Sequence, residues 1–297
     1  MSTVNKLPCP FHGIGTALIT PLCDGAPDHA AMRQIVEAQI EGGVAALIVL
    51  GTTGEAVTLK EQERAAVLCT VMEAAGGRVP IIVGTGAPDT RDAVVAAKYA
   101  KGQGADGILV VTPYYNKGTS EGIVQHYLSV ADAAEVPMIL YNVPSRTGVN
   151  LTLPQLSRLA EHPNIVAIKE ASGDIDRAAD VIATLGDRLM VYGGNDGELL
   201  PTLSLGGIGL ISVISNLYPA KMAEIYRLFI EGRHTEAAKA AAVLLPMIRL
   251  MFAETNPSPI KYAMSLSGLC TSEMRLPMTP PSPALCERIK AEMKRLE

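Results

Sequence analysis

A lysine near the middle of the chain ends a short apolar run and is followed at once by turn residues. The run that starts at Ile165 is too short for a buried helix, and its β-branched residues predict a strand buried on both faces. Because side chains alternate along a strand, Ile165, Ala167 and Lys169 should share one face. The small Ala167 leaves room for an inward-pointing amine, whereas an isolated lysine at a strand end usually meets water. The residues around it decide between these two positions.

Residues with hydroxyl groups, and one arginine, lie at the ends of other short apolar runs in the sequence. They are Thr52, Thr53, Tyr114, Tyr115 and Tyr141, with Arg146 a few residues beyond the last. Singly, each has an ordinary interpretation, because threonines make turns, tyrosines pack at strand ends and loop arginines are solvated. Together they surround a lysine with proton donors and a positive charge.

This combination predicts Schiff-base chemistry. A neutral lysine amine can add to the carbonyl of a keto acid, and burial favours the neutral form over the ammonium. The imine withdraws electrons, so the neighbouring carbon loses a proton and becomes a nucleophilic enamine. Phenols and hydroxyls can move the protons, and a positioned acid or base accelerates such a step by about 10²- to 10⁴-fold.

The histidines argue against a metal site. None of the five ends a predicted strand, and Asp196 alone is no metal site. The glycine pairs Gly193-Gly194 and Gly206-Gly207 could cradle a phosphate, but no Ser or Thr cluster accompanies them, so turns are the better interpretation. We expect no metal and no cofactor other than a covalent adduct on Lys169.

One pattern repeats along the chain: a short β-branched run, a turn, and a helical pattern. Eight runs are predicted as strands, at Gly13–Thr20, Ala46–Leu50, Pro80–Val83, Gly107–Val111, Pro137–Leu140, Ile165–Lys169, Leu189–Tyr192 and Ile208–Ser212. Helical patterns begin at Asp28 and near Lys60, Thr90, Ser120, Leu153 and Pro219, the last with breaks near Asn256–Pro259 and Pro277–Pro283.

Eight strand–helix units predict an α/β fold, a (β/α)8 TIM barrel with a C-terminal helical extension. A doubly wound sheet would carry G-x-G-x-x-G after its first strand, and the segment from Gly13 lacks the third glycine. We place the barrel at residues 1–215 and the extension at residues 216–297. In a barrel the catalytic groups lie at the carboxyl ends of the strands, where the lysine and the hydroxyls fall.

Composition sets the class of protein. The chain has 297 residues, 48% of them hydrophobic and 19% charged, which excludes a disordered protein. A net charge of -5 offers no basic surface for nucleic acid and no polybasic patch for a membrane. No apolar run approaches the roughly 20 residues of a membrane span. Five scattered cysteines and no signal-peptide pattern at the N-terminus predict free thiols and a cytoplasmic location.

Several linked motifs carry a family resemblance. Gly51–Glu55, Thr112–Asn116, Tyr141–Gly148 and Ile168–Ala171 resemble motifs of the pyruvate-dependent family that includes dihydrodipicolinate synthase and N-acetylneuraminate lyase. Further likeness in Asn256–Lys261 and Arg275–Pro280 extends the resemblance from about Gly13 to the C-terminus.

The resemblance implies roles for eight residues. Lys169 would form the imine with pyruvate, and Tyr141 would donate and accept protons beside it, in a hydroxyl relay with Thr52 and Tyr115. Thr53 would hold the pyruvate carboxylate, with main-chain groups near Gly194 and Ile211 lining the same pocket. Arg146 would bind the carboxylate of aspartate semialdehyde, and such a charged hydrogen bond contributes about 1.5–3 kcal/mol.

The resemblance also implies a reaction and an assembly. Condensation of pyruvate with aspartate semialdehyde would give 4-hydroxy-tetrahydrodipicolinate, on the route to lysine and diaminopimelate. The Ser145-Arg146-Thr147-Gly148 run favours this synthase over a sugar-acid or hydroxy-keto-acid aldolase, which is the alternative; a catalytically silent relative is a third. In the family the counterpart of Tyr115 reaches in from a neighbouring subunit, which implies a homodimer or homotetramer.

One departure from the family concerns feedback. In lysine-inhibited members a polar pocket follows the Gly-Thr-Thr-Gly-Glu motif and the third strand. The matching positions here supply neither the histidines nor the asparagine of that pattern; they are Ala56, Val57, Glu61, Arg64 and Pro88. We therefore predict weak or absent inhibition by lysine.

Overall fold

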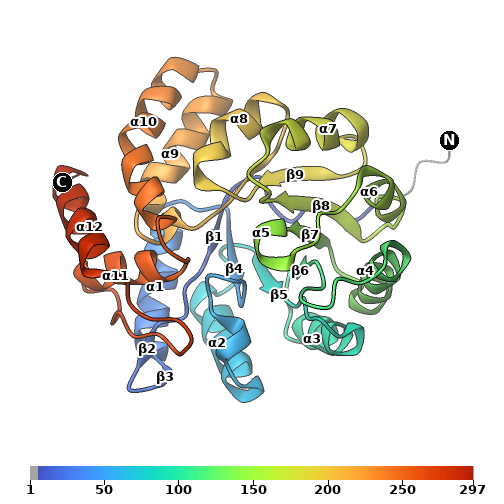
Figure 1. The fold of residues 1–297 in the computed structure, drawn as a ribbon, viewed down its shortest axis with the longest axis horizontal. Helices are drawn as coiled ribbons and strands as arrows, with labels where there is room; N and C mark the ends of the chain where they lie inside the picture. The colour runs from blue at the N-terminus through green and yellow to red at the C-terminus, as the bar shows by residue number, and fades with distance from the viewer. Residues whose placement is uncertain (1–5, 297) are drawn as a thin grey trace. The chain divides into compact units, whose positions relative to one another are not determined.

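A computed structural model describes residues 6–296 (Figure 1). Its eight long strands follow the order β1-β10-β9-β8-β7-β6-β5-β4 in a closed barrel, and helices separate them along the chain. The predicted (β/α)8 fold with a helical C-terminal segment is confirmed. The chain divides into two compact units, which are described in turn. The central unit contains Pro80–Ile211 and the segment up to His12; the flanking unit contains Gly13–Val79 and the chain from Ser212 on.

Parallel strands form the core of the central unit. They are β5 (Ile81–Gly84), β6 (Gly107–Val111), β7 (Met138–Asn142), β8 (Ile165–Glu170), β9 (Met190–Gly193) and β10 (Gly209–Ser212), whose last residue belongs to the flanking unit. The helices are α3 (Thr90–Gly102), α4 (Ser120–Ala134), α5 (Pro144–Thr147), α6 (Leu153–Leu159), α7 (Ile175–Leu185) and α8 (Leu199–Ser204), with the 3-10 turn η2 (Asp196–Glu198). Apolar residues fill both faces of the strands, as expected for a parallel sheet covered by helices.

Polar residues fix where these helices start. Asp89, Thr119, Thr152 and Asp174 precede α3, α4, α6 and α7, and each side chain accepts a hydrogen bond from a backbone N–H of the first turn. Such N-caps satisfy donors that the helix itself leaves unpaired. The turns between strands and helices are therefore set by local sequence.

The flanking unit combines a strand pair with the C-terminal helices. Strands β1 (Gly13–Ala17) and β4 (Ala46–Val49) pair in parallel, and β2 (Leu22–Cys23) with β3 (Ala26–Pro27) forms a small hairpin. The helices are α1 (His29–Glu41), α2 (Glu61–Ala75), α9 (Pro219–Ile230), α10 (His234–Met251), α11 (Ser258–Leu266) and α12 (Pro283–Leu296), with 3-10 turns η1 (Ala56–Thr58) and η3 (Ile214–Asn216). Helix α10 packs against α9, α11 and α12, the orange to red elements of Figure 1.

Most predicted elements are found within a few residues of their expected positions, including the two breaks in the C-terminal helices. The hairpin β2–β3 and the helices α5, α7 and α8 were not located from the sequence. The hairpin and α5 are only a few residues long and carry no periodic pattern. The proposed boundary between residues 215 and 216 differs from the two compact units and stays a prediction.

Two further observations concern the class of protein. No helix described between residues 6 and 296 is long and apolar enough to cross a bilayer. All five cysteines are free thiols, as the sequence predicted.

Candidate active site

Lys169 and Tyr141 form a contact pair on neighbouring strands of the central unit. The parallel register of β7 and β8 sets Tyr141 opposite Lys169, and the lysine Nζ lies 4.4 Å from the centroid of the tyrosine ring. Lys169 is only 5% exposed, so its side chain is buried instead of lying at a solvated strand edge. The register shifts between Met138 and Ile139, so the pairing that aligns the two residues begins at Ile139 and Ala167. The sequence predicted both residues, and the structure brings them together.

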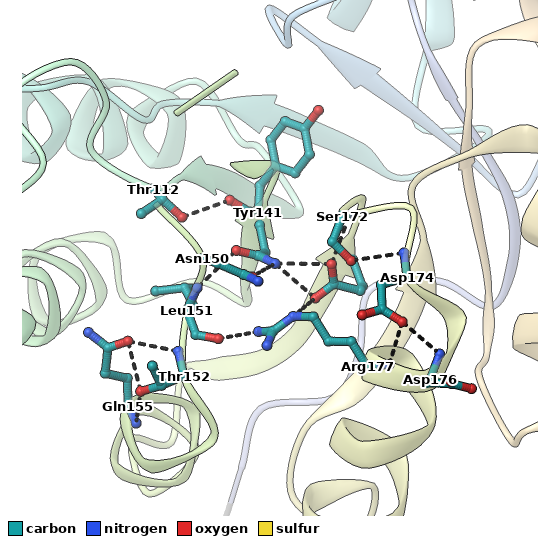
Figure 2. Close-up of polar contacts among 12 residues, drawn as sticks. Thr112, Tyr141, Asn150, Leu151, Thr152, Gln155, Ser172, Asp174, Asp176 and Arg177 are labelled. Atoms are coloured by element: carbon teal, nitrogen blue, oxygen red, sulfur yellow. Dashed lines mark hydrogen bonds and ion pairs between the residues drawn. The ribbon is translucent and has the colours of Figure 1, made fainter. Parts of the chain in front are cut away.

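The next residue on each strand belongs to a buried polar network. Asn142 lies opposite Glu170 in the same register, and alternation places both on the strand face that Tyr141 and Lys169 do not occupy. Asn142 Nδ2 donates to both carboxylate oxygens of Glu170, at 3.0 Å each. Ser172 N donates to Glu170 Oε1 at 2.8 Å, and Arg177 Nε donates to Oε2 at 3.0 Å. Figure 2 shows the ring of Tyr141 pointing away from Arg177 and Asn150.

The network extends into the loop before α6. Asn142 Nδ2 also donates to Asn150 Oδ1 at 2.8 Å, and its Oδ1 accepts from Leu151 N at 3.1 Å. The second arm of the Arg177 guanidinium donates to the carbonyl of Leu151. Arg177 reaches this position because Asp174 caps the first turn of α7. The sequence analysis missed these residues, although Asn142 and Glu170 directly follow the two predicted catalytic residues.

Two hydroxyl groups support the backbone of Tyr141. Thr112 Oγ1 donates to the carbonyl of Tyr141 at 3.1 Å, and Tyr127 Oη donates to Thr112 Oγ1 at 3.0 Å. Burial raises the pKa of Tyr127, so this phenol stays protonated and keeps donating. The end of β7 is therefore bonded to both neighbouring strands, through Thr112 after β6 and through Glu170 on β8.

Tyr115 occupies a strained turn at the surface. Asn116 N donates to the carbonyl of Tyr114 at 3.0 Å, which closes a three-residue γ-turn around Tyr115 at φ 72°. A classic γ-turn with positive φ is rare and strained for a non-glycine residue, and such strain is often found at functional sites. Tyr115 is 88% exposed, whereas Lys169 and Tyr141 are buried at 5% and 7% exposed.

The other predicted residues of the central unit take different positions. Arg146 is exposed on the short helix α5, whose first residue is Pro144. Gly194 N donates to the carbonyl of Glu170 at 2.7 Å, and a Cβ at Gly194 would lie 2.4 Å from Ala171 Cβ. Only glycine fits there. Ile211 is fully buried on β10.

In the flanking unit, Thr52 and Thr53 lie in the turn Gly51–Glu55 that follows β4. Thr53 is buried, and its Oγ1 accepts a hydrogen bond from Asn256 Nδ2 at 3.1 Å. Because the oxygen accepts from the amide, the hydroxyl hydrogen remains available to donate, as the predicted contact with a carboxylate requires. Thr20 Oγ1 donates to the carbonyl of Gly54 at 2.7 Å and so helps to fix the turn.

A buried ion pair ends the same turn. Lys261 Nζ on α11 donates to Glu55 Oε1 at 2.7 Å, and the two side chains are 0% and 4% exposed. Glu55 has φ 53°, a left-handed conformation that is strained for a glutamate. Both residues lie in motifs recognised in the sequence, but the sequence does not indicate that they pair. The C-terminal segment thus holds the turn through Asn256 and Lys261.

Within residues 6–296 no group of three or more His, Cys, Asp or Glu side chains forms a candidate metal site. That the reaction needs no metal stays a prediction.

Comparison with known proteins identifies the family. The model of the dihydrodipicolinate synthetase family matches residues 10–296. The chain belongs to this family. The 4-hydroxy-tetrahydrodipicolinate synthase of Citrifermentans bemidjiense is 45% identical over 284 residues, covering 96% of this chain and 98% of the relative. The dihydrodipicolinate synthetase resemblance predicted from the motifs is therefore confirmed.

Solved structures of family members agree with the fold. Dihydrodipicolinate synthase from Thermotoga maritima superimposes with a TM-score of 0.95 at 39% identity, covering 97% of this chain and 99% of that one. The enzyme from Acinetobacter baumannii, solved in complex with pyruvate, gives 0.93 at 41% identity, with 96% and 98% covered.

Proposed function

We propose that the chain is a 4-hydroxy-tetrahydrodipicolinate synthase, a Schiff-base-forming carbon–carbon lyase that condenses pyruvate with aspartate 4-semialdehyde. The observation that carries the proposal is the Lys169 amine, buried at a strand end and 4.4 Å from the Tyr141 ring. Family membership supports it, because the relatives of about 45% identity bear this name.

The proposed reaction begins with an imine. The lone pair of Lys169 Nζ attacks the C2 carbonyl of pyruvate, and water leaves after two proton transfers. We assign the movement of these protons to Tyr141, whose ring centroid lies 4.4 Å from Lys169 Nζ, and we assign Thr52 and Tyr115 to the same relay. Loss of a C3 proton then gives an enamine, which attacks the aldehyde carbon of aspartate semialdehyde. The substrate amine finally displaces Lys169 from C2 and closes the ring.

Two residues are assigned to substrate carboxylates. Thr53 has its hydroxyl hydrogen available for the pyruvate carboxylate, since its oxygen already accepts from Asn256. Arg146 lies exposed on α5 and is assigned to aspartate semialdehyde. Main-chain groups at Gly194 and Ile211 are assigned to the pyruvate pocket. Gly194 contributes its carbonyl there, because its N–H is engaged by Glu170.

The imine is tested by mass. Incubation with pyruvate followed by borohydride should add one reduced pyruvate to the chain, on the peptide that contains Lys169. An unchanged mass would contradict the proposal. Offering aspartate semialdehyde, N-acetylmannosamine and a sugar aldehyde to the pyruvate-loaded protein then identifies the second substrate. Consumption of a sugar aldehyde alone would favour the sugar-acid lyase alternative.

We also propose that the protein acts in the cytoplasm, where small acids of central metabolism are available. We further propose that its active form contains at least two copies, as a homodimer or homotetramer. The strained, exposed Tyr115 supports this, because its side chain is open to solvent in this chain and is available to reach the site of a second copy. Co-expression of a Lys169→Met chain with a Tyr115→Phe chain should restore activity that neither has alone, since a mixed pair contains one intact site. Failure of complementation in a purified mixed dimer would argue that each chain acts alone.

A further inference from the structure

Asn142 and Glu170 lie on the face of β7 and β8 opposite to Tyr141 and Lys169, and together with Arg177 they form a network to which we assign no step of the reaction. It joins β7 to β8 through Asn142 and Glu170, and β8 to α7 through Glu170 and Arg177. The Glu170 side chain is 4% exposed and that of Arg177 15%, so the carboxylate is buried and its cation is partly buried.

Glu170 has a full set of partners. Its two oxygens accept four hydrogen bonds, from the Asn142 amide twice, from Ser172 N and from Arg177 Nε. A carboxylate satisfied on both oxygens fixes its own rotamer and the backbone that carries it. Since Lys169 precedes Glu170, and Tyr141 precedes Asn142, the same hydrogen bonds fix the two Cα positions from which the reactive side chains start.

The position of the network relative to the register shift strengthens this point. The strand pairing shifts by one residue between Met138 and Ile139, so the alignment of Tyr141 with Lys169 depends on the contacts that follow this irregularity. A slip of one residue would move Lys169 to the opposite face of its strand. The Asn142–Glu170 hydrogen bonds form only in the register that sets Tyr141 opposite Lys169.

We propose that Glu170, together with Asn142 and Arg177, is a positioning residue that holds the β7–β8 alignment in which the Lys169 amine meets Tyr141. This inference rests on the proposed imine mechanism. It predicts that a defect in the network lowers the rate of imine formation beyond what lost stability explains.

A charge exchange between the two strands gives the sharpest test. In Glu170→Gln an amide faces the Asn142 amide, and in Asn142→Asp a carboxylate faces the Glu170 carboxylate. Both variants lose the match of donor and acceptor between the strands. Each single variant should trap pyruvate with borohydride about 10- to 100-fold more slowly than wild type, because a small misplacement of reacting groups has effects of this size. The double variant restores an amide opposite a carboxylate between the two strands, but the Glu170→Gln side chain offers one oxygen instead of two to Ser172 N and Arg177 Nε. It should therefore recover only in part and trap pyruvate faster than either single variant.

Leu185→Ala provides the matched control. Leu185 is fully buried on α7, the helix of Arg177, and takes no part in the network. This variant should lose stability yet trap pyruvate at the wild-type rate when all proteins are compared well below their unfolding midpoints.

In the network variants kcat should fall while KM for aspartate semialdehyde stays unchanged.

The outcomes separate the two proposals. If wild type gains no pyruvate adduct, the proposed function fails and this inference fails with it. If wild type is trapped and both single variants react as fast as Leu185→Ala, the function stands and the positioning role is wrong. Equal defects in the single variants and no recovery in the double variant would also overturn it. Should a single variant fail to fold, Arg177→Lys, which keeps the charge but cannot reach both Glu170 and Leu151, must show an intermediate rate.

Discussion

Two buried carboxylates adjoin the predicted site residues, and the chain neutralises them in different ways. Glu170 in the central unit accepts four hydrogen bonds, and its cation, Arg177, follows only seven residues later. Glu55 in the flanking unit pairs with Lys261, 206 residues later. Its second oxygen is buried and has no hydrogen-bond partner among residues 6–296. The first arrangement fixes a local alignment of strands, whereas the second ties a turn to a distant helix.

The difference indicates that the Glu170 network aligns side chains of the site, whereas the Glu55–Lys261 pair contributes to stability. A fully satisfied network gives conformational precision, which the Lys169–Tyr141 contact requires. An ion pair with one unsatisfied oxygen carries a large desolvation cost and is held in place by the packing around it. Disturbing the first should change chemistry, and disturbing the second should change stability.

The same substitution at the two buried lysines tests this contrast with the largest effect. Lys169→Met should abolish pyruvate trapping and lower kcat by more than about 10³-fold, because the nucleophile itself is removed. Lys261→Met should keep the pyruvate adduct. Mass spectrometry after borohydride reduction, with steady-state rates, checks both variants. An adduct that persists in Lys169→Met would contradict the assignment of the lysine.

Stability should respond in the opposite order. Lys261→Met leaves the Glu55 carboxylate buried without a cation and should lower the free energy of unfolding by about 3–5 kcal/mol. Glu55→Gln combined with Lys261→Met should regain much of that loss, because no buried charge remains. Urea unfolding at a fixed protein concentration measures both. Equal stabilities of the single and the double variant would speak against the pair.

Acid should act on His126 of the central unit at a higher pH than on Glu63 of the flanking unit. Burial lowers the pKa of His126 on α4 to about 4, from a usual value of 6.5. The unfolded chain therefore binds a proton first, and about 3 kcal/mol of stability should be lost as the pH falls from 6.5 to 4. A side-chain hydrogen bond from Arg275 lowers the pKa of Glu63 in the flanking unit to about 2, so its contribution disappears only between pH 4.5 and 2.

His126→Asn isolates the first of these effects. The asparagine can keep the hydrogen bond to Thr90 that the imidazole Nδ1 makes, but it does not titrate. Urea midpoints measured between pH 7 and 4.5 should fall less steeply for this variant than for wild type. Parallel curves would show that another group controls acid stability.

Removing a single hydroxyl should have a smaller effect. Thr53→Val keeps the shape of the side chain but loses the hydrogen assigned to the pyruvate carboxylate. We expect KM for pyruvate to rise about tenfold, since a hydrogen bond to a charged group is worth about 1.5–3 kcal/mol and water replaces part of it. The KM for aspartate semialdehyde should not change. A fall in kcat with no change in KM would assign Thr53 to another step.

Lysine should have the smallest effect. The positions that correspond to the family's inhibitor pocket carry no histidine or asparagine, and Val57 among them is 79% exposed. Adding lysine to the assay at millimolar concentration should leave the rate nearly unchanged. Inhibition at micromolar lysine would show that other residues form the pocket.

The sequence predicted the strands and the positions of Lys169 and Tyr141 near strand ends because both depend on local pattern. Lys169 and Tyr141 end strands, and strand ends of a barrel meet at one face. Alternation could also have placed Asn142 and Glu170 together on the other face, but it does not show that Arg177 turns back from α7 to meet them. That contact depends on the capped start of the helix and on the packing of α7 against the sheet.

Other features lay outside the reach of local pattern. Nothing near Glu55 points to Lys261, because the two residues meet only through tertiary structure. The γ-turn at Tyr115 was missed because tyrosine rarely adopts a positive φ and carries no turn signal. Each of these features is long-range or strained, which are the properties that sequence patterns describe least well.

The pairing of Glu55 with Lys261 also has a consequence for how the protein is made. A ribosome adding about 5–20 residues per second completes the glutamate roughly 10 to 40 s before it reaches a cation 206 residues later. Throughout that interval the carboxylate must remain hydrated, so the loop it ends cannot settle into its final position. A chain that stops before Lys261 would therefore contain Lys169 and Tyr141 but lack the ion pair that holds the threonine turn.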